Sequence, residues 1–211
     1  TYSADIVPDE LWGLALTDGS TINRIVAGVD DDFFFVESNR ALTRVNRSGV
    51  VISSIDLPLT EIATAGQVGY SRDHVWEAVG TDEDGSVFVA SMQSGGSTGT
   101  ATERQTESGL FKYVEDLSDR NKMVLQWAIR PTVPAPSGTV GGYIVRAVGH
   151  QGFLYVCLND LVPTARSFVL RMPNVDTTTG PASVDYVKLC EITGAKLAGA
   201  PISSGLWGGA V

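Results

Sequence analysis

The stretch that decides the fold is Val75–Ala90, which reads VWEAVGTDEDGSVFVA. Two apolar runs flank Asp82–Gly85, a short segment of acidic residues and glycine. Apolar runs rich in valine and aromatic residues are typical of strands, and a short Asp/Gly segment between two of them predicts a hairpin. The stretch therefore predicts two antiparallel strands joined by a tight turn.

The same pattern occurs twice more, in Ile22–Val36 and in Tyr143–Val156. Each of the three hairpins is followed by a third apolar run and then a fourth, which have strand length. The third runs lie at 42–45, 110–113 and 169–172, and the fourth runs lie at 51–55, 124–129 and 186–190. We therefore expect an all-β fold of repeated four-stranded antiparallel meanders, with units at about 20–58, 74–131 and 142–193.

The units share two markers. A basic residue stands at one matching place in each third strand, as Arg44, Lys112 and Arg171, and a glycine precedes each hairpin turn. These glycines, at positions 28, 80 and 149, are 52 and 69 residues apart. Loop insertions explain the unequal spacing, and the largest, Gln93–Ser108, is rich in Gly, Ser and Thr and predicts a flexible loop.

The chain of 211 residues has material for a core, since 43% of it is hydrophobic. We expect a single all-β repeat domain over residues 1–211. Trp12 and Trp207 lie in matching Leu-Trp-Gly contexts, which predicts partial units at 1–19 and 194–211. The sequence also fits a segment of a longer chain.

The blade-like segments resemble the β-propeller superfamily, in particular its sugar-lactonase-like, NHL and YVTN-type blades. The resemblance rests on Asp30–Val36, Gly80–Val89, Gly149–Val156 and the three basic residues, and it covers about residues 20–192. It implies four-stranded blades arranged radially around an axis, with binding at the ends of a central channel. A closed propeller has four to eight blades, so with three units and two end pieces either the chain is part of a longer propeller, or oligomerisation completes it, or the sheets stack in another all-β arrangement.

Charge and hydropathy exclude two classes of partner. The formal net charge is −9, and a nucleic-acid or anionic-membrane binder needs clustered Lys and Arg. No apolar run approaches the roughly 18 residues of a membrane-spanning helix. We therefore expect no nucleic-acid binding and no membrane insertion.

Cys157 and Cys190, the two cysteines, both fall in strand-like runs. If another strand lies between those strands, the two Cα atoms are about 9–10 Å apart, too far for a disulfide. We expect two buried free thiols. A metal or redox role would need further ligands nearby.

Few residues suggest chemistry. His74 and His150 stand beside turns, and no nucleophile motif accompanies them. Asp30–Asp32 and Asp82–Gly85 offer oxygen ligands for Ca²⁺, but Asp and Gly are also the residues that form hairpin turns. We favour turn formation, and the sequence predicts no catalytic, cofactor-binding or metal-binding residue and no cofactor.

Aromatic residues at strand spacing allow two interpretations. They form either a stacking platform for sugars or, as is commoner, part of a core or an interface. The residues concerned are Trp76, Phe88, Tyr113, Trp127 and Tyr155.

The sequence favours a non-enzymatic structural or interaction protein, a component of an extracellular or virus-particle assembly that contacts copies of itself or other proteins. A composition with 11 Arg and four Lys is compatible with that setting. The alternative is a ligand- or glycan-binding propeller module. A propeller-type hydrolase or lyase is a third hypothesis, and it would need at least three acidic or His side chains converging at a channel mouth.

Overall fold

The computed structural model describes residues 22–37, 41–57, 74–93, 109–135, 138–140, 143–160 and 166–193. These residues form three four-stranded antiparallel sheets and one two-stranded hairpin, and they contain no α-helix. In every four-stranded sheet the strands lie side by side in chain order. The predicted all-β fold of repeated four-stranded meanders is therefore confirmed.

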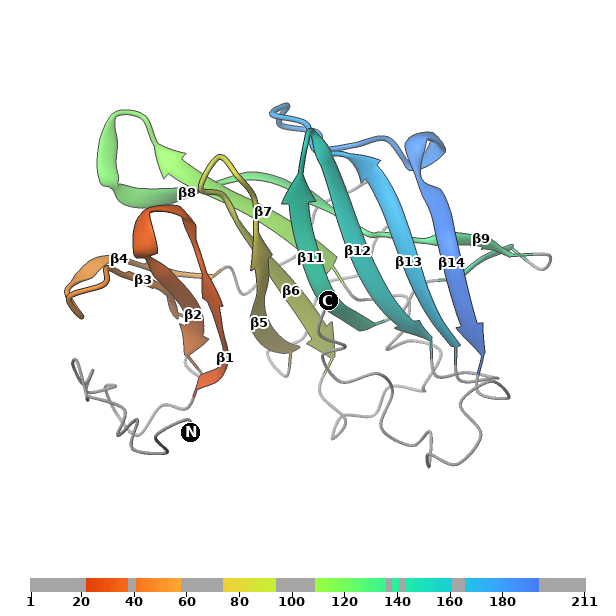
Figure 1. Ribbon diagram of the computed structural model, residues 1–211, viewed down its shortest axis with the longest axis horizontal. Coiled ribbons are helices and arrows are strands. Elements are labelled where there is room, and N and C mark those ends of the chain that lie inside the picture. The colour runs from red at the N-terminus through yellow and green to blue at the C-terminus, as the bar shows by residue number, and fades with distance from the viewer. Residues whose placement is uncertain are drawn as a thin grey trace, which may run out of the picture.

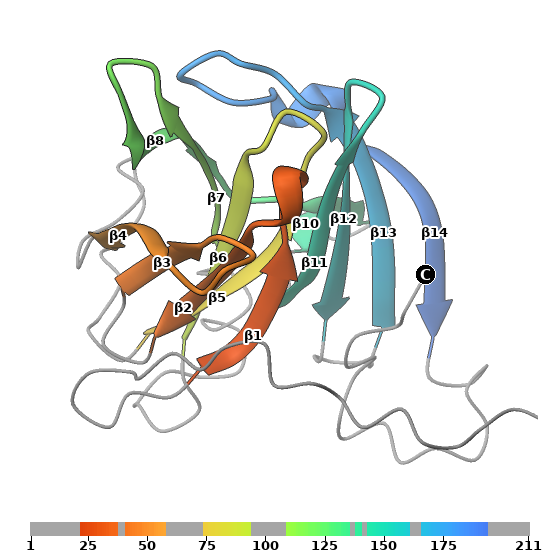
Figure 2. The ribbon, with the colours of Figure 1, turned by 60° about the vertical axis from the view of Figure 1, so that its left-hand side comes forward.

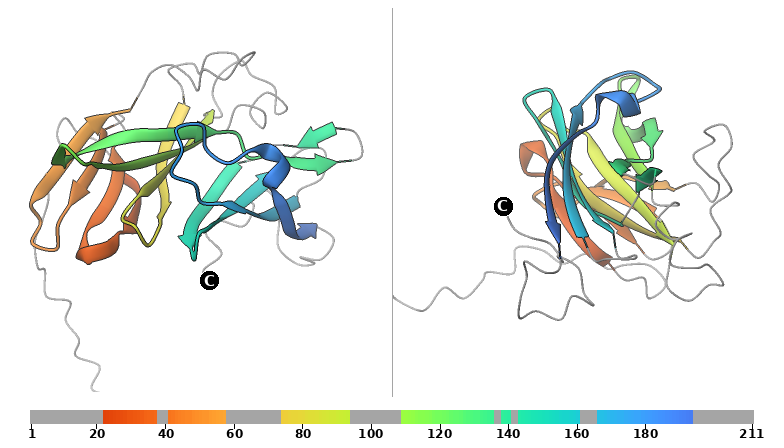
Figure 3. Two further views of the ribbon diagram at one scale, coloured as in Figure 1. Left: turned by 90° about the horizontal axis from the view of Figure 1, so that it is seen from above. Right: turned by 90° about the vertical axis from the view of Figure 1, so that its right-hand side faces the viewer.

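The first sheet consists of β1 (Ile22–Ala27), β2 (Phe33–Glu37), β3 (Ala41–Val45) and β4 (Val51–Asp56), with a 3-10 turn η2 (Val29–Asp31) between β1 and β2. The second consists of β5 (His74–Thr81), β6 (Val87–Gln93), β7 (Gly109–Asp116) and β8 (Asp119–Ile129). The third consists of β11 (Tyr143–His150), β12 (Phe153–Asp160), β13 (Arg166–Pro173) and β14 (Val187–Thr193), with η3 (Ser183–Asp185) before β14. The hairpin β9 (Val133–Ala135) and β10 (Gly138–Val140) lies beside the third sheet (Figure 3).

The second sheet lies between the other two (Figure 1), and each of its faces contributes side chains to a core. Successive side chains of a strand point to opposite faces. On β6, Val87 and Val89 pack against the first sheet, whereas Phe88 and Ala90 pack against the third. A strand buried on both faces needs a nearly continuous apolar run, which explains the sequence VFVA.

The first strands of the three sheets are neighbours. β5 contacts both β1 and β11, and β4 contacts β8 at the outer side (Figure 2). The described sheets do not close into a ring or a barrel. None of the helical turns in the described ranges has the length and apolar character needed to cross a membrane.

Some predictions fall on residues that the structure does not describe. The partial units at 1–19 and 194–211, with Trp12 and Trp207, lie outside the described residues. Of the loop predicted at Gln93–Ser108, Gln93 instead ends β6, and residues 94–108 lie outside the described residues.

Two of the glycines that mark the repeat lie where the second and third sheets approach most closely. A Cβ atom at Gly80 would stand 1.6 Å from the carbonyl oxygen of Ala147 on β11. A Cβ atom at Gly149 would stand 2.2 Å from the Cβ of Asp82. Both contacts join backbone or near-backbone atoms of different sheets, so a larger residue forces the sheets apart.

We expect Gly80→Ala to destabilise the protein by about 3 kcal/mol or more, because overpacking against a backbone atom cannot be relieved by a side-chain rotation. Urea unfolding measures the change. Gly152→Ala is the control, since no heavy atom lies within 4 Å of its added Cβ and only the positive φ of 76° opposes it. That control should lose about 1 kcal/mol; equal losses for the two variants would contradict the close approach.

Candidate functional site

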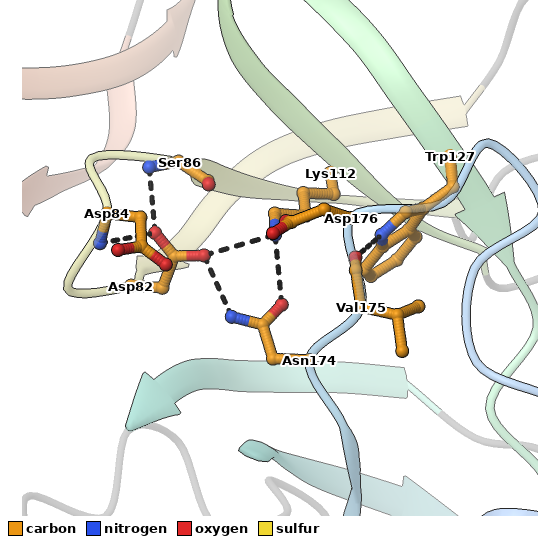
Figure 4. A network of polar contacts seen from close by, with 8 residues as sticks. All are labelled: Asp82, Asp84, Ser86, Lys112, Trp127, Asn174, Val175 and Asp176. Carbon is orange, nitrogen blue, oxygen red and sulfur yellow. Dashed lines mark hydrogen bonds and ion pairs between the residues drawn. The ribbon is translucent and has the colours of Figure 1, made fainter. Parts of the chain in front are cut away.

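The most unusual side chain of the described core is Lys112, a lysine with an exposure of 0%. It lies on β7 between Phe111 and Tyr113, which both face the first sheet. Alternation along the strand therefore directs Lys112 toward the third sheet. A buried ammonium is costly unless charged and polar groups surround it, so its neighbours identify the candidate site (Figure 4).

Three polar side chains meet the ammonium group. Nζ of Lys112 donates to Oδ1 of Asn174 at 3.1 Å and to Oδ1 of Asp176 at 2.9 Å, and it lies 3.4 Å from Oδ2 of Asp82. Nδ2 of Asn174 also donates to Oδ2 of Asp82, at 2.9 Å. Asp82 belongs to the second sheet, whereas Asn174 and Asp176 follow β13 of the third. The network thus joins two sheets.

Local structure positions both sides of this network. Oδ1 of Asp82 accepts hydrogen bonds from the backbone N–H groups of Asp84 at 3.1 Å and Ser86 at 2.8 Å, which forms the β5–β6 turn. Nε1 of Trp127 donates to the carbonyl oxygen of Val175 at 3.0 Å, which holds the segment after β13 (Figure 4). Oδ1 of Asp82 therefore stabilises the turn, whereas Oδ2 contacts Lys112 and Asn174 in the network.

The first sheet contains a similar arrangement around Arg44 on β3. Nε of Arg44 donates to Oδ2 of Asp32 at 2.6 Å, and its Nη1 donates to Oε2 of Glu115 on β7 at 3.0 Å. Burial lowers the pKa of Arg44, but the hydrogen bonds to Glu115 and Asp32 outweigh burial, and the pKa is raised. In both sheets a cation on the third strand contacts a carboxylate of its own first turn and a carboxylate of the next sheet.

Arg171 lies on the face of the third sheet that corresponds to the faces of Arg44 and Lys112 in their sheets, as predicted. Leu170 and Met172 face the second sheet and are buried, so Arg171 between them lies on the opposite face. There its guanidinium carbon stands 4.8 Å from the centre of the Phe153 ring.

The acidic turns form as predicted and are occupied by protein contacts. Asp32 contacts Arg44, and Oδ2 of Asp31 lies 3.3 Å from Nη1 of Arg47. Oδ1 of Asp82 accepts the two turn hydrogen bonds described above. In the part of the chain that the structure describes, no three His, Cys, Asp or Glu side chains gather in a way that suits a metal ion. Turn formation explains these carboxylates.

His150 joins two hairpin turns. Its Nδ1 lies 2.6 Å from Oε1 of Glu83, and the backbone N–H of Gln151 donates to Oε2 of the same carboxylate at 3.0 Å. The backbone hydrogen bond from Gln151, followed by the one with His150, lowers the pKa of Glu83. His74 begins β5, and its side chain lies outside the described residues.

The cysteines are free, as predicted, and β13 separates their strands. The prediction that both are buried is wrong, because Cys190 is exposed and Cys157 is only half-buried. Both lie on the face of the third sheet that points away from the second, opposite Val169 in the register. Burial raises the pKa of the Cys157 thiol.

Four of the five aromatic residues considered for sugar stacking belong to the cores: Trp76, Phe88, Tyr113 and Trp127 are at most 6% exposed. Burial also raises the pKa of Tyr113 far above its usual range. These four form packing contacts, including Trp76 with Phe111 at a ring-centroid distance of 4.9 Å. The core interpretation is confirmed for them, and Tyr155 lies half-buried in the third sheet.

The sequence did not point to Asn174 or Asp176. They lie 62 and 64 residues from Lys112, in the connection before β14, and no motif surrounds them. Neither a family model nor a curated protein matches this chain. The geometry of the sheets and of the lysine network therefore carries the functional argument.

We expect Lys112→Met to destabilise the protein by about 3 kcal/mol or more, because it removes the polar side chain that joins the buried Asp82 to Asn174 and Asp176 of the third sheet. Asp82→Asn keeps an oxygen for the turn and removes the charge. In the double variant the two losses should therefore overlap, with an interaction energy of at least about 1 kcal/mol in a urea-unfolding cycle. If the losses of unfolding free energy in the two single variants simply added in the double variant, the residues would not form a coupled network.

The lowered pKa of Glu83 makes its contribution to stability depend on pH. A carboxyl whose folded pKa lies below its unfolded value of 4.5 stabilises the fold above that pH, and this stabilisation is lost as pH falls through the folded pKa. The wild type should therefore exceed Glu83→Gln in Tm at pH 6, and the difference should vanish as the pH is lowered below about 4.5. A Tm difference that does not change with pH would contradict this role.

Proposed function

We propose that the protein is a non-enzymatic structural or interaction protein that associates with copies of itself. The observation that carries the proposal is the outer face of the third sheet, which we define as the face pointing away from the second sheet. Two features of this face support association: its exposed apolar side chains and its arginines.

Apolar side chains stand exposed across this outer face. In the strand register, Val148 is opposite Tyr155, Tyr155 is opposite Arg171, and Arg171 is opposite Val187. The four side chains therefore lie on the same face of the sheet. Val148 is 42% exposed and Val187 is 43% exposed, and Phe153 on the same face is 38% exposed. Contiguous exposed apolar side chains are characteristic of association surfaces.

The same face carries Arg146 and Arg171, for which the structure records no ion pair with a described carboxylate. Arg146 is paired with Cys157 in the register, so both arginines lie among the apolar side chains. Other described cations pair with carboxylates, namely Arg24, Arg44, Arg47, Lys112, Lys122 and Lys188. Arginine in an apolar surround is enriched in interfaces and favours an acidic partner.

A copy of this chain has the required chemistry. Its formal net charge is −9, so its surface offers an excess of carboxylates to two arginines. The sheets also pack in series, first on second and second on third, and the second sheet is covered on both faces. A copy seated on the outer face would continue this series.

We also propose that the sheets are blades of a propeller-like arrangement, in an extracellular or virus-particle assembly. Support for the blades comes from their four-stranded meanders and from the adjacent first strands β1, β5 and β11. The extracellular or virus-particle setting is supported by the amino-acid composition alone.

Light scattering during size-exclusion chromatography tests the proposal. The wild type should form a species larger than 22.4 kDa at high protein concentration. Arg146→Glu/Arg171→Glu should raise the dissociation constant at least about tenfold, because reversed charges then face an acidic copy. A wild type that remains monomeric at all concentrations would overturn the proposal.

Arg47→Glu/Lys122→Glu is the matched control, since it changes the net charge equally at exposed cations of the other two sheets. It should leave the dissociation constant within about twofold of the wild type. An equal effect of both double variants would show that net charge, rather than the outer face, governs association.

A further inference from the structure

Asp82 contacts both nitrogens of the lysine network. Its Oδ2 lies 3.4 Å from Nζ of Lys112 and accepts a hydrogen bond at 2.9 Å from Nδ2 of Asn174. Nζ also donates to Oδ1 of Asn174 at 3.1 Å. Since a C=O bond is about 1.23 Å long, Nζ is within about 4.3 Å of the amide carbon Cγ of Asn174. A nucleophile, an amide carbon and a carboxylate that reaches the attacking and leaving nitrogens are thus assembled (Figure 4).

The surroundings favour reaction over simple ion pairing. Lys112 is 0% exposed and the Asp82 side chain is 1% exposed, so the two charges face each other away from water. The 3.4 Å between Nζ and Oδ2 of Asp82 gives a proton leaving Nζ an acceptor within the network, and the departure of that proton frees the amine lone pair. Asp176 also contacts Nζ, at 2.9 Å, but its side chain is 76% exposed and it does not reach the amide nitrogen in the described contacts. Fixed proximity replaces the collision that an amine and an amide would need in solution.

We propose that Lys112 and Asn174 form an intramolecular isopeptide bond, with Asp82 as the proton carrier. After Nζ gives a proton to Oδ2 of Asp82, Nζ attacks Cγ of Asn174. Asp82 returns that proton to Nδ2, the Cγ–Nδ2 bond breaks and ammonia leaves. The second proton of Nζ passes through Asp82 to the ammonia, which departs as ammonium. A lysine ammonium and an asparagine amide become a secondary amide and an ammonium ion, without oxidation or reduction, and Asp82 ends as a carboxylate.

The bond would join the second and third sheets covalently. Lys112 lies on β7 and Asn174 follows β13, so the bond closes a loop between residues that are 62 positions apart. A cross-link of this kind restricts the unfolded chain and suits a protein whose sheets bear load in an assembly. The inference concerns the single chain and stands or falls independently of self-association.

Intact-mass measurement under denaturing conditions tests the bond. The wild type should weigh about 17 Da less than its sequence, which is the mass of the ammonia lost. Tryptic digestion should yield one branched peptide that joins Lys112 to Asn174, with no cleavage after Lys112. A wild-type mass equal to the sequence mass, with Lys112 in a linear peptide, overturns the proposal without any variant.

Variants separate this bond from ammonia loss elsewhere, such as a succinimide at another asparagine. Lys112→Met and Asp82→Asn should each restore the full sequence mass, whether or not the variant folds, because the amine or the proton carrier is absent. Lys122→Met is the control: it removes an exposed lysine of β8 and should keep the deficit of about 17 Da. A deficit that persists in Lys112→Met overturns the proposal.

Discussion

The constraint on which the structure depends is that the second sheet contributes side chains from both of its faces to a core. Its inward and outward side chains both enter a core, one shared with the first sheet and one with the third. Such a sheet cannot tolerate a charge at most positions. Lys112, the one buried cation among the described residues of this sheet, is therefore placed where the third sheet supplies oxygen ligands for it, through the connection after β13.

Acidic residues in two of the described hairpin turns contact the third-strand cations. Asp32 and Asp82 form turns, as their sequence context indicates, but each also turns one oxygen toward a cation on the third strand of its own sheet. The hairpin turn, the third strand and the neighbouring sheet are thereby fixed relative to one another. In the third sheet Arg171 lies on the corresponding face, with its guanidinium carbon 4.8 Å from the centre of the Phe153 ring.

Local patterns made the hairpins and meanders predictable from the sequence, because a turn of Asp and Gly between valine-rich runs acts over only a few residues. The matching place of the basic residues was predictable for the same reason: Arg171 points away from the second sheet, as Lys112 points away from the first. The exposure of Cys190 was not predictable, because the composition of a strand does not indicate which face of its sheet packs against another sheet. Asn174 and Asp176 belong to the site through folding alone, from more than sixty residues away.

The position of the second sheet has a further consequence for how the molecule comes apart. Because it supplies one wall of each core, the first sheet cannot detach without uncovering Trp76 and Phe111, and the third cannot detach without uncovering Phe88 and Trp127. Loss of either neighbour therefore weakens the sheet that holds the other. The repeat is visible in the sequence as three separate units, yet the middle repeat contributes to both cores and so couples the other two.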